Sequence, residues 1–251
     1  MQRRLGNFLL GLILPIALFA AWIYFSSNGS FAESELPKPS SVFKVISELD
    51  SRDQLWWNIS ASLQRVALGY FFGTLIALVL GSAAGLNKVV NRLVTPLLQA
   101  IRAVPSLAWV PLLIIWIGIG EGPKLTLIGI GAFFPVFTTV VSGIRNVDRH
   151  LVEVGRAYGL KNWAIIRTIY LPAAAPQIFS GLRLGLAQSW LFLVAAELIA
   201  SAKGLGFLLV DSQASARTDI VIFSILTLAI LGKISDLILA TIEKRVLAWN
   251  K

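Results

Sequence analysis

Residues 153–172 read EVGRAYGLKNWAIIRTIYLP. This stretch is polar at its start and apolar at its end, and it carries basic side chains at Arg156, Lys161 and Arg167. On both sides lie blocks of sequence with long uncharged runs, which are typical of helices that cross lipid. The connector is longer than a simple loop needs to be, so it is expected to have a task of its own.

Local signals in and around this stretch predict two short helices. Asp148 is a residue type that caps helix N-termini, and apolar residues follow it at helical spacing. Gly159 is expected to end the first helix, because glycine adopts the left-handed conformation at little cost. Asn162 is expected to cap a second helix. Pro172 and Pro176 are then expected to break the chain before the next apolar block.

The composition predicts an integral membrane protein. Of the 251 residues, 56% are hydrophobic and 14% are charged, whereas a soluble domain carries about 25% charged residues. We therefore expect an all-α membrane protein with a single transmembrane domain over residues 1–251. The formal net charge of +9 is explained by basic cytoplasmic loops that face anionic lipid. The expected partner is therefore the lipid bilayer, and no nucleic acid partner is expected.

Six transmembrane helices are predicted, because each apolar segment approaches the roughly 20 residues that span a bilayer. They lie at about 8–26, 62–86, 96–120, 124–144, 177–201 and 219–242. Lys and Arg are concentrated in alternate connecting segments, among which we count Arg102 and the loop 145–176. This asymmetry places both termini and that loop in the cytoplasm. An outer linker with a surface helix is predicted at 27–60.

Glycines recur at four-residue spacing in two of the spans. The pairs are Gly69 with Gly73, Gly81 with Gly85, and Gly181 with Gly185. Such spacing predicts that helix backbones approach closely in lipid. Pro105, Pro111 and Pro135 predict kinks, which would serve either a solute pathway or ordinary packing.

Several charged residues fall inside the predicted spans, where charge is costly unless it faces protein or water. Arg65 and Glu197 lie toward the outer ends of their spans, and they are expected either to pair across helices or to line the external mouth. We interpret them as markers of an outer gate. Lys233 and Asp236 are expected to neutralise each other, and Arg183 to reach the cytoplasmic surface.

Motifs for catalysis are missing from the sequence. No G-x-x-x-x-G-K-[ST] motif occurs, and the Gly232-Lys233 pair is followed by isoleucine. The chain has no cysteine, and His150 is its only histidine, so no metal site is expected. We predict no catalytic residue and no nucleotide site in this chain.

Positions in and near the opening stretch match the pattern E-A-A-x3-G-x9-I-x-L-P at every spacing, through Glu153, Gly159, Ile169, Leu171 and Pro172. The two alanines of the pattern are replaced by Val154 and Gly155. This pattern is the cytoplasmic-loop signature of membrane permeases of bacterial ABC importers, which the chain resembles over nearly its whole length. Segments such as SLQRVALGY and LPAAAPQIFSGLRLGLAQSW are similar to the nitrate, sulfonate, taurine and bicarbonate group, and most of all to aliphatic sulfonate permeases.

The resemblance implies a type I ABC importer permease-like fold. It also implies that the chain crosses the bacterial inner (plasma) membrane several times. It implies two cytoplasmic ABC ATPase subunits that bind ATP and Mg²⁺, a second permease subunit in a homodimer, and an extracytoplasmic solute-binding protein. This chain itself would hold no cofactor. The ATPase would dock on a coupling helix formed by Glu153, Val154, Gly155, Arg156, Ala157, Tyr158, Gly159 and Leu160.

The transported solute is then expected to be a small organic or inorganic anion, first of all an aliphatic sulfonate. Taurine, nitrate and bicarbonate remain alternatives within the group. Two readings of another class also remain open, namely a stand-alone secondary transporter or channel, and a membrane scaffold that docks a cytoplasmic protein without transport. The absence of a convincing internal repeat argues against the secondary transporter.

Overall fold

The computed structural model describes the backbone of residues 2–105 and 108–249, and the side chains of residues 12–105, 108–198 and 201–249. Its regular structure is helical throughout these residues, as predicted. The elements are α1 (Gln2–Ser27), α2 (Pro39–Ser51), α3 (Gln54–Leu86), α4 (Lys88–Arg102), α5 (Trp109–Ile117), α6 (Glu121–Arg145), α7 (Arg149–Ala157), α8 (Asn162–Ile165), the π-helix η2 (Ile166–Tyr170), α9 (Leu171–Ala200), α10 (Leu205–Ala214) and α11 (Thr218–Val246).

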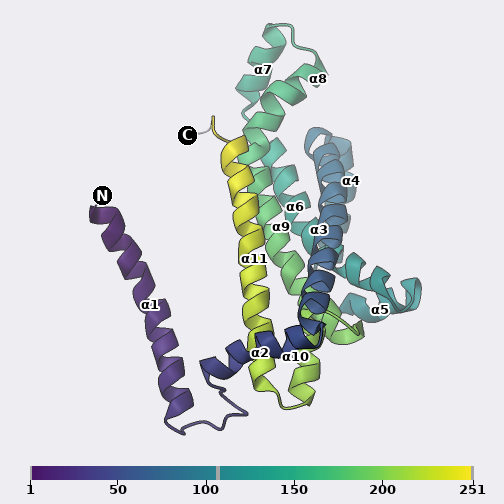
Figure 1. Ribbon diagram of the computed structural model, residues 1–251. Coiled ribbons are helices and arrows are strands. Elements are labelled where there is room, and N and C mark those ends of the chain that lie inside the picture. Colours follow the sequence, from purple (N-terminus) through teal and green to yellow (C-terminus); the bar gives the residue numbers. More distant parts are fainter. Residues whose placement is uncertain (1, 106–107, 250–251) are drawn as a thin grey trace.

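Helix α6 lies at the centre of the bundle and packs against both α3 and α9 (Figure 1). The paired glycines of α3 and α9 all face α6 and allow this approach. A Cβ atom on Gly73 would collide with the backbone of Gly129, and one on Gly181 would collide with Thr139. The predicted close packing at the glycine pairs is therefore confirmed, and α6 is their common partner.

Four helices in the described part of the chain are long and apolar enough to cross a membrane, namely α3, α6, the continuous helix Asn162–Leu198, and α11. All or nearly all of four predicted spans fall within α3, α6, α9 and α11, at 62–86, 124–144, 177–201 and 219–242. The first predicted span, 8–26, lies within α1, whose described apolar part, Leu12–Ser27, is shorter. The total of six spans stays a prediction.

The predicted span at 96–120 is wrong as a single helix. The structure divides this range between α4, which ends at Arg102, and α5, which begins at Trp109. Pro105 lies in the connection between them. Proline has no N–H to donate and disfavours helical geometry at the residue before it. The chain therefore leaves the helix here, where the sequence predicts only a kink.

The predicted break at Pro172 and Pro176 is also wrong, because α9 begins at Leu171 and contains both prolines. Helix α9 continues directly from η2, where the N–H of Leu171 donates to the carbonyl of Ile166, five residues earlier. This wider turn makes room for a proline that cannot donate and would clash in a regular helix. The chain is therefore helical without a break from Asn162 onward, so the last part of the predicted loop 145–176 already belongs to a long helix.

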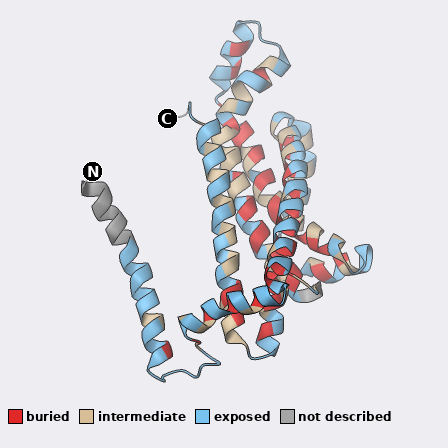
Figure 2. Cartoon of the chain, viewed as in Figure 1, coloured by how far each residue is buried: buried red, intermediate tan, exposed pale blue. Residues whose placement is uncertain are grey.

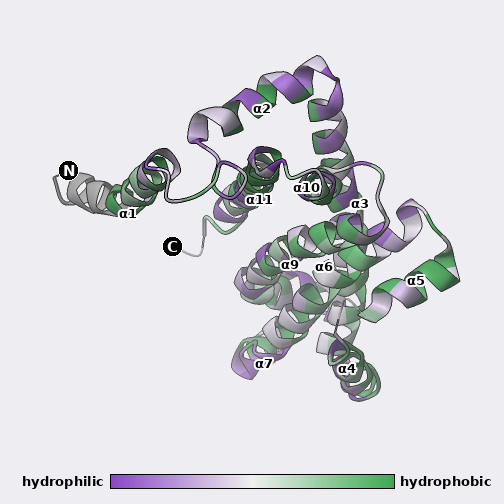
Figure 3. Cartoon of the chain, turned by 90° about the horizontal axis from the view of Figure 1, so that it is seen from below, coloured by the Kyte–Doolittle hydropathy of each residue, from purple (hydrophilic) through white to green (hydrophobic). Residues whose placement is uncertain are grey.

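Helix α2 lies at one end of the bundle and packs against α11 and α3 (Figure 3). Its buried residues Val42, Val45 and Leu49 belong to one apolar cluster with side chains of α10 and α11. The predicted outer linker at 27–60 thus contains its helix, although its last residues already belong to α3. Helix α10 is absent from the predicted elements, because its 10 residues are too few to stand out as a span.

An ion pair joins α2 to the beginning of α11. Arg217 Nη2 donates to Glu48 Oε2 at 2.6 Å and to Asp219 Oδ2 at 2.9 Å. The hydrogen bond from Arg217 lowers the pKa of Glu48 below its ordinary value. Hydrogen bonds to the two carboxylates raise the pKa of Arg217. Both side chains of the Glu48–Arg217 pair are therefore charged at neutral pH.

Much of the outer surface of the bundle is exposed, as Figure 2 shows along α11, and many of its exposed side chains are large and apolar. Ile230 and Ile238 of this helix are each 58% exposed. Exposed apolar side chains of this extent are unfavourable in water and suit contact with lipid chains. A helix is permitted in lipid because its backbone satisfies its own hydrogen bonds.

Candidate functional site

Helices α7 and α8 project beyond the bundle at the end where α11 finishes, opposite α2 and α10 (Figure 1). The carboxylate of Asp148 accepts a hydrogen bond from the N–H of His150 at 2.9 Å, which confirms Asp148 as the cap of α7. Gly159 follows this helix with φ of 77°. The N–H of Leu160 donates to the carbonyl of Gly155 at 3.0 Å, so the helix ends in a Schellman turn, as its glycine predicts.

The second predicted cap is wrong. Asn162 is the first residue of α8 rather than its cap, and Lys161 takes the capping position without a side-chain hydrogen bond. Lys161 has an extended backbone with ψ of 158°, which turns the chain into α8. The helix–turn–helix order of the prediction is nevertheless present.

The inner side of α7 packs tightly on η2. A Cβ atom on Gly155 would lie 2.5 Å from Cδ1 of Ile169 and 3.5 Å from Cδ1 of Leu160. This crowding leaves little room for a side chain larger than that of alanine, which the family pattern has at this position. Val152 and Ile165 are buried in the same region. The glycine turn and this contact together fix the position of α7 relative to α9.

The opposite side of α7 and α8 is apolar and exposed. Tyr158 is 84% exposed and Trp163 is 72% exposed, and Leu151 and Val154 are about half exposed. We call these four residues the α7–α8 patch. Large apolar side chains at the tip of a polar projection are a feature of protein-docking surfaces.

The sequence leaves two interpretations of Glu153 open. Its carboxylate forms an ion pair either with Arg156 on the same helix or with a basic residue of a partner protein. In the described part of the chain, the ion-pair contact of Glu153 is with His150, at 3.7 Å between Oε2 and Nδ1, and not with Arg156. The side chain of Glu153 is 69% exposed. It also lines a cavity of about 510 Å³ together with Arg145, Arg149 and Arg156.

The base of the projection is continuous with the core of the bundle. Val147, Val152 and Ile165 belong to the same apolar cluster as Val140 and Ile144 of α6. The cavity of about 510 Å³ also touches Ile144, Val147 and Val152, but the contacts of these side chains with one another are close-packed and resist displacement. A force on α7 is therefore transmitted to α6 and α9 through packed side chains.

A second group of functional candidates lies at the other end of the bundle. Arg65 is 3% exposed and donates from Nη1 to Glu197 Oε1 at 2.7 Å, which confirms the predicted pair across helices. Arg65 Nε also donates to Glu121 Oε2 at 2.6 Å, and Lys124 donates to Glu121 at 3.2 Å. We call these four residues, together with Ser62 and Asn58, the outer polar cluster.

The outer polar cluster fastens the turn between α9 and α10 to α3. Glu197 accepts hydrogen bonds from the hydroxyl of Ser62 at 2.9 Å and from the N–H of Gly206 at 2.8 Å. Asn58 accepts from the N–H of Gly204 at 2.7 Å. Both partners of the Arg65–Glu197 pair are buried, so neither lines an open mouth in this structure. A role in gating stays a prediction.

Charges in the other half of the bundle also pair between helices. Arg183 Nε donates to Asp236 Oδ1 at 2.9 Å, and Arg183 Nη1 donates to Glu243 at 3.3 Å. Arg183 therefore joins α9 to α11, and its reach to the cytoplasmic surface stays a prediction. The predicted contact of Lys233 with Asp236 is present at 3.7 Å. It is longer than the contact of Arg183 with the same carboxylate, which is 2.9 Å.

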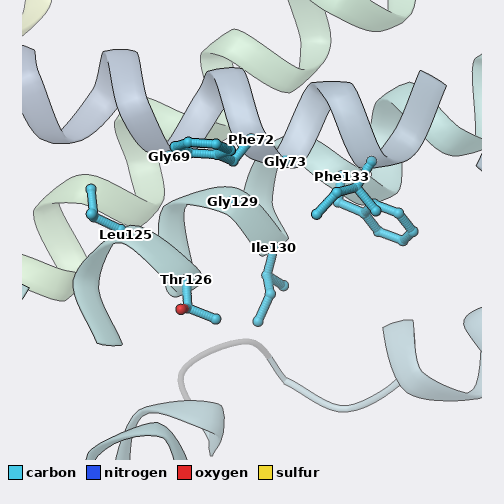
Figure 4. A pocket seen from close by; sticks show the side chains of 9 residues that line it. Gly69, Phe72, Gly73, Leu125, Thr126, Gly129, Ile130 and Phe133 are labelled. Carbon is cyan, nitrogen blue, oxygen red and sulfur yellow. The ribbon is translucent and has the colours of Figure 1, made fainter. Parts of the chain in front are cut away.

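The structure corrects the position of Arg102, which the sequence assigns to a cytoplasmic loop. Arg102 is the last residue of α4 and lines two cavities, of about 390 and 420 Å³, with residues from the middle of α6. A third cavity, of about 370 Å³, lies between α3 and α6 around Gly73 and Phe133 (Figure 4). Its lining is almost entirely apolar. Of these three cavities, the first two therefore offer a cation to a solute.

Comparisons with known proteins agree with this architecture. The family described as "Binding-protein-dependent transport system inner membrane component" matches residues 70–248. The chain is 36% identical over 248 residues to a protein of Bacillus subtilis (strain 168) named as an aliphatic sulfonates transport permease, SsuC, covering 99% of this chain and 90% of that one. It is 36% identical over 220 residues to the taurine transport system permease protein TauC of Escherichia coli (strain K12), covering 86% and 80%.

Among solved structures, a chain of the MetNI methionine ABC transporter is similar, with a TM-score of 0.63 and 20% identity. The match covers 76% of this chain and 93% of that chain. It confirms the predicted type I ABC importer permease-like fold. The chain therefore belongs to the family of binding-protein-dependent transport system inner membrane components, the permease subunits of ABC importers.

Proposed function

We propose that this permease subunit forms the transmembrane path of an ATP-driven importer for a small anion, first of all an aliphatic sulfonate. The names of its relatives support an anionic solute, since they include permeases for aliphatic sulfonates, taurine and bicarbonate. Taurine, nitrate and bicarbonate are the alternatives within this proposal. The observation that carries it is the α7–α8 patch, which is exposed at its tip and packed on α6 and α9 at its base.

In this proposal, two cytoplasmic ABC ATPase subunits bind ATP and Mg²⁺ and grip the α7–α8 patches of two permease chains. The second permease chain is a copy of the first. A solute-binding protein delivers the anion at the end of the bundle that carries α2 and α10. ATP binding favours one of two packed arrangements of the permease pair, and hydrolysis releases it.

The test is reconstitution in proteoliposomes with ATP enclosed inside and the solute-binding protein outside. Radiolabelled ethanesulfonate is expected to accumulate only when permease, ATPase, ATP and binding protein are all present. Competition by unlabelled ethanesulfonate, taurine, nitrate and bicarbonate identifies the preferred anion. Uptake without the ATPase would support a stand-alone transporter instead, and ATPase binding without solute-stimulated hydrolysis would support a scaffold.

A further inference from the structure

Arg102 lies at a depth where membrane helices normally carry no free charge. It lines the cavity of about 420 Å³ together with Pro135 and Thr138 of α6 and Gln188 of α9. These three residues belong to the interiors of helices that are long and apolar enough to cross a membrane. Arg102 thus lines a cavity beside the middle of α6 and α9, and its second cavity extends from there to Arg145 at the end of α6.

Within the described residues, Arg102 takes part in none of the ion pairs, whereas Arg65 and Arg183, in the interiors of spanning helices, are both paired. Arg65 pairs with Glu121 and Glu197, and Arg183 pairs with Asp236. A charged side chain at membrane depth faces protein, water or a ligand, because its exposure to lipid is costly. Arg102 therefore requires an anionic or strongly polar partner from outside the described chain.

A second copy of the chain offers no free carboxylate for this purpose. Each acidic residue in the four spanning helices contacts a basic side chain of its own chain. These acidic residues are Glu121, Glu197, Asp219, Asp236 and Glu243. A lipid phosphate lies at the membrane surface and not at the level of Pro135. The remaining anion that enters this depth is the transported solute.

The rest of the cavity suits an anion with a short apolar part. Gln188 is exposed and brings an amide that donates hydrogen bonds. Trp109, Phe134 and Phe192 supply apolar walls. A single cation, a few polar groups and aromatic walls are the composition of small-molecule sites.

We propose that Arg102 binds the anionic head group of the solute midway along its path, while Gln188 and the aromatic walls hold the remainder. This inference rests on the proposed function and names its solute contact. An arginine presents several donors in a fixed plane, which matches the oxygens of a sulfonate. The same site would also accept other small oxyanions, with less contact to the aromatic walls.

The absence of native cysteine permits a charge-rescue experiment. Arg102→Cys is reconstituted with an ATPase whose own cysteines have been replaced, and uptake of radiolabelled ethanesulfonate is measured. We expect a loss of at least tenfold, with ATPase assembly unchanged. Aminoethyl methanethiosulfonate, which restores a positive charge, should recover uptake severalfold, whereas methyl methanethiosulfonate, which is neutral, should not. Arg92→Cys, on the same helix but outside both cavities, is the matched control and should respond to neither reagent.

Wild-type uptake by Arg102→Cys, or equal rescue by the neutral reagent, would overturn the role of Arg102. The proposed function would survive either result, because it depends on ATP-driven uptake by the wild-type complex. Failure of the wild-type complex itself to take up any of the anions would overturn the proposed function. The two failures are therefore separate.

Discussion

Gly155 of α7 lies directly against Ile169 of η2, so that even a single added carbon on the glycine would come 2.5 Å from Cδ1 of the isoleucine. Both residues belong to the sequence pattern that marks the cytoplasmic loop. Their contact joins the projecting helix to the helix that continues into the membrane. It is therefore one of the close contacts through which α7 is connected to the bundle.

Gly155→Leu is expected to force α7 away from η2, at a cost of about 1–3 kcal/mol, which is typical of overpacking. Gly155→Ala is the matched control and should be tolerated, because the nearest atom is the end of a flexible side chain. The measurement is the amount of ABC ATPase that co-purifies with each variant from membranes containing equal permease. Equal recovery with leucine and alanine would show that the contact is unimportant for docking.

Gly159→Val is expected to weaken ATPase docking about tenfold without affecting membrane insertion. The φ of 77° at this position is left-handed, which costs about 1–2 kcal/mol for a residue with a side chain. Gly159→Asn should retain most of the docking, since asparagine accepts this conformation. Titration of detergent-solubilised permease with the ATPase gives the affinity. An unchanged affinity for the valine variant would contradict the role of the turn.

Glu197→Gln is expected to lower the unfolding temperature of the permease in detergent. Removal of one charge from a buried pair costs about 3–5 kcal/mol, and the remaining contact of Arg65 with Glu121 should keep the loss at the lower end of this range. The partly exposed Glu243→Gln serves as the control. If the pair also acts as an outer gate, uptake should fall by more than the loss of folded protein. Wild-type uptake per folded molecule would remove Glu197 from the transport mechanism.

The Glu48–Arg217 pair predicts a dependence of stability on pH. The pKa of Glu48 is lower in the folded protein than its ordinary value of 4.5, so its contribution is complete above that value and is lost as the pH falls through the folded-state pKa. We expect the unfolding temperature of Glu48→Gln to lie below that of the wild type at pH 7. The difference should shrink below pH 4.5. A difference that is constant over the whole pH range would show that the ion pair does not stabilise α2.

The parts of the fold that depend on local chemistry could be predicted from the sequence. Asp148 and Gly159 lie at the two ends of α7 as their residue types indicate, because a cap and a left-handed turn depend on a few neighbouring backbone groups. The glycine pairs likewise predict close packing. The identity of the helix they face could not be predicted, since Gly73 and Gly129 meet only through the tertiary fold.

The features that were missed depend on contacts over long sequence distances. Glu121 is 56 residues from Arg65, and nothing in the sequence near either residue indicates their contact. Arg102 directly precedes an uncharged run that begins at Ala103, so the sequence assigns its charge to the cytoplasmic segment before a span. Its true depth depends on how α4 packs beside α6. The sequence predicts a break at the beginning of α9 because Pro172 would disrupt a regular helix, whereas the π-helix at residues 166–170 accommodates this proline.

The central claim is that the α7–α8 patch receives force from a separate ATPase, and site-directed cross-linking tests it most directly. Tyr158→Cys introduces a single, highly exposed thiol at the tip, because the chain has no other cysteine. A short bifunctional thiol reagent should join this position to a cysteine placed in the surface of the ABC ATPase that contacts the patch. The cross-linked complex should be fixed in one state, so that ATP-driven uptake of ethanesulfonate stops. Solute uptake that continues while the ATPase makes no contact with residues 153–160 would contradict the account.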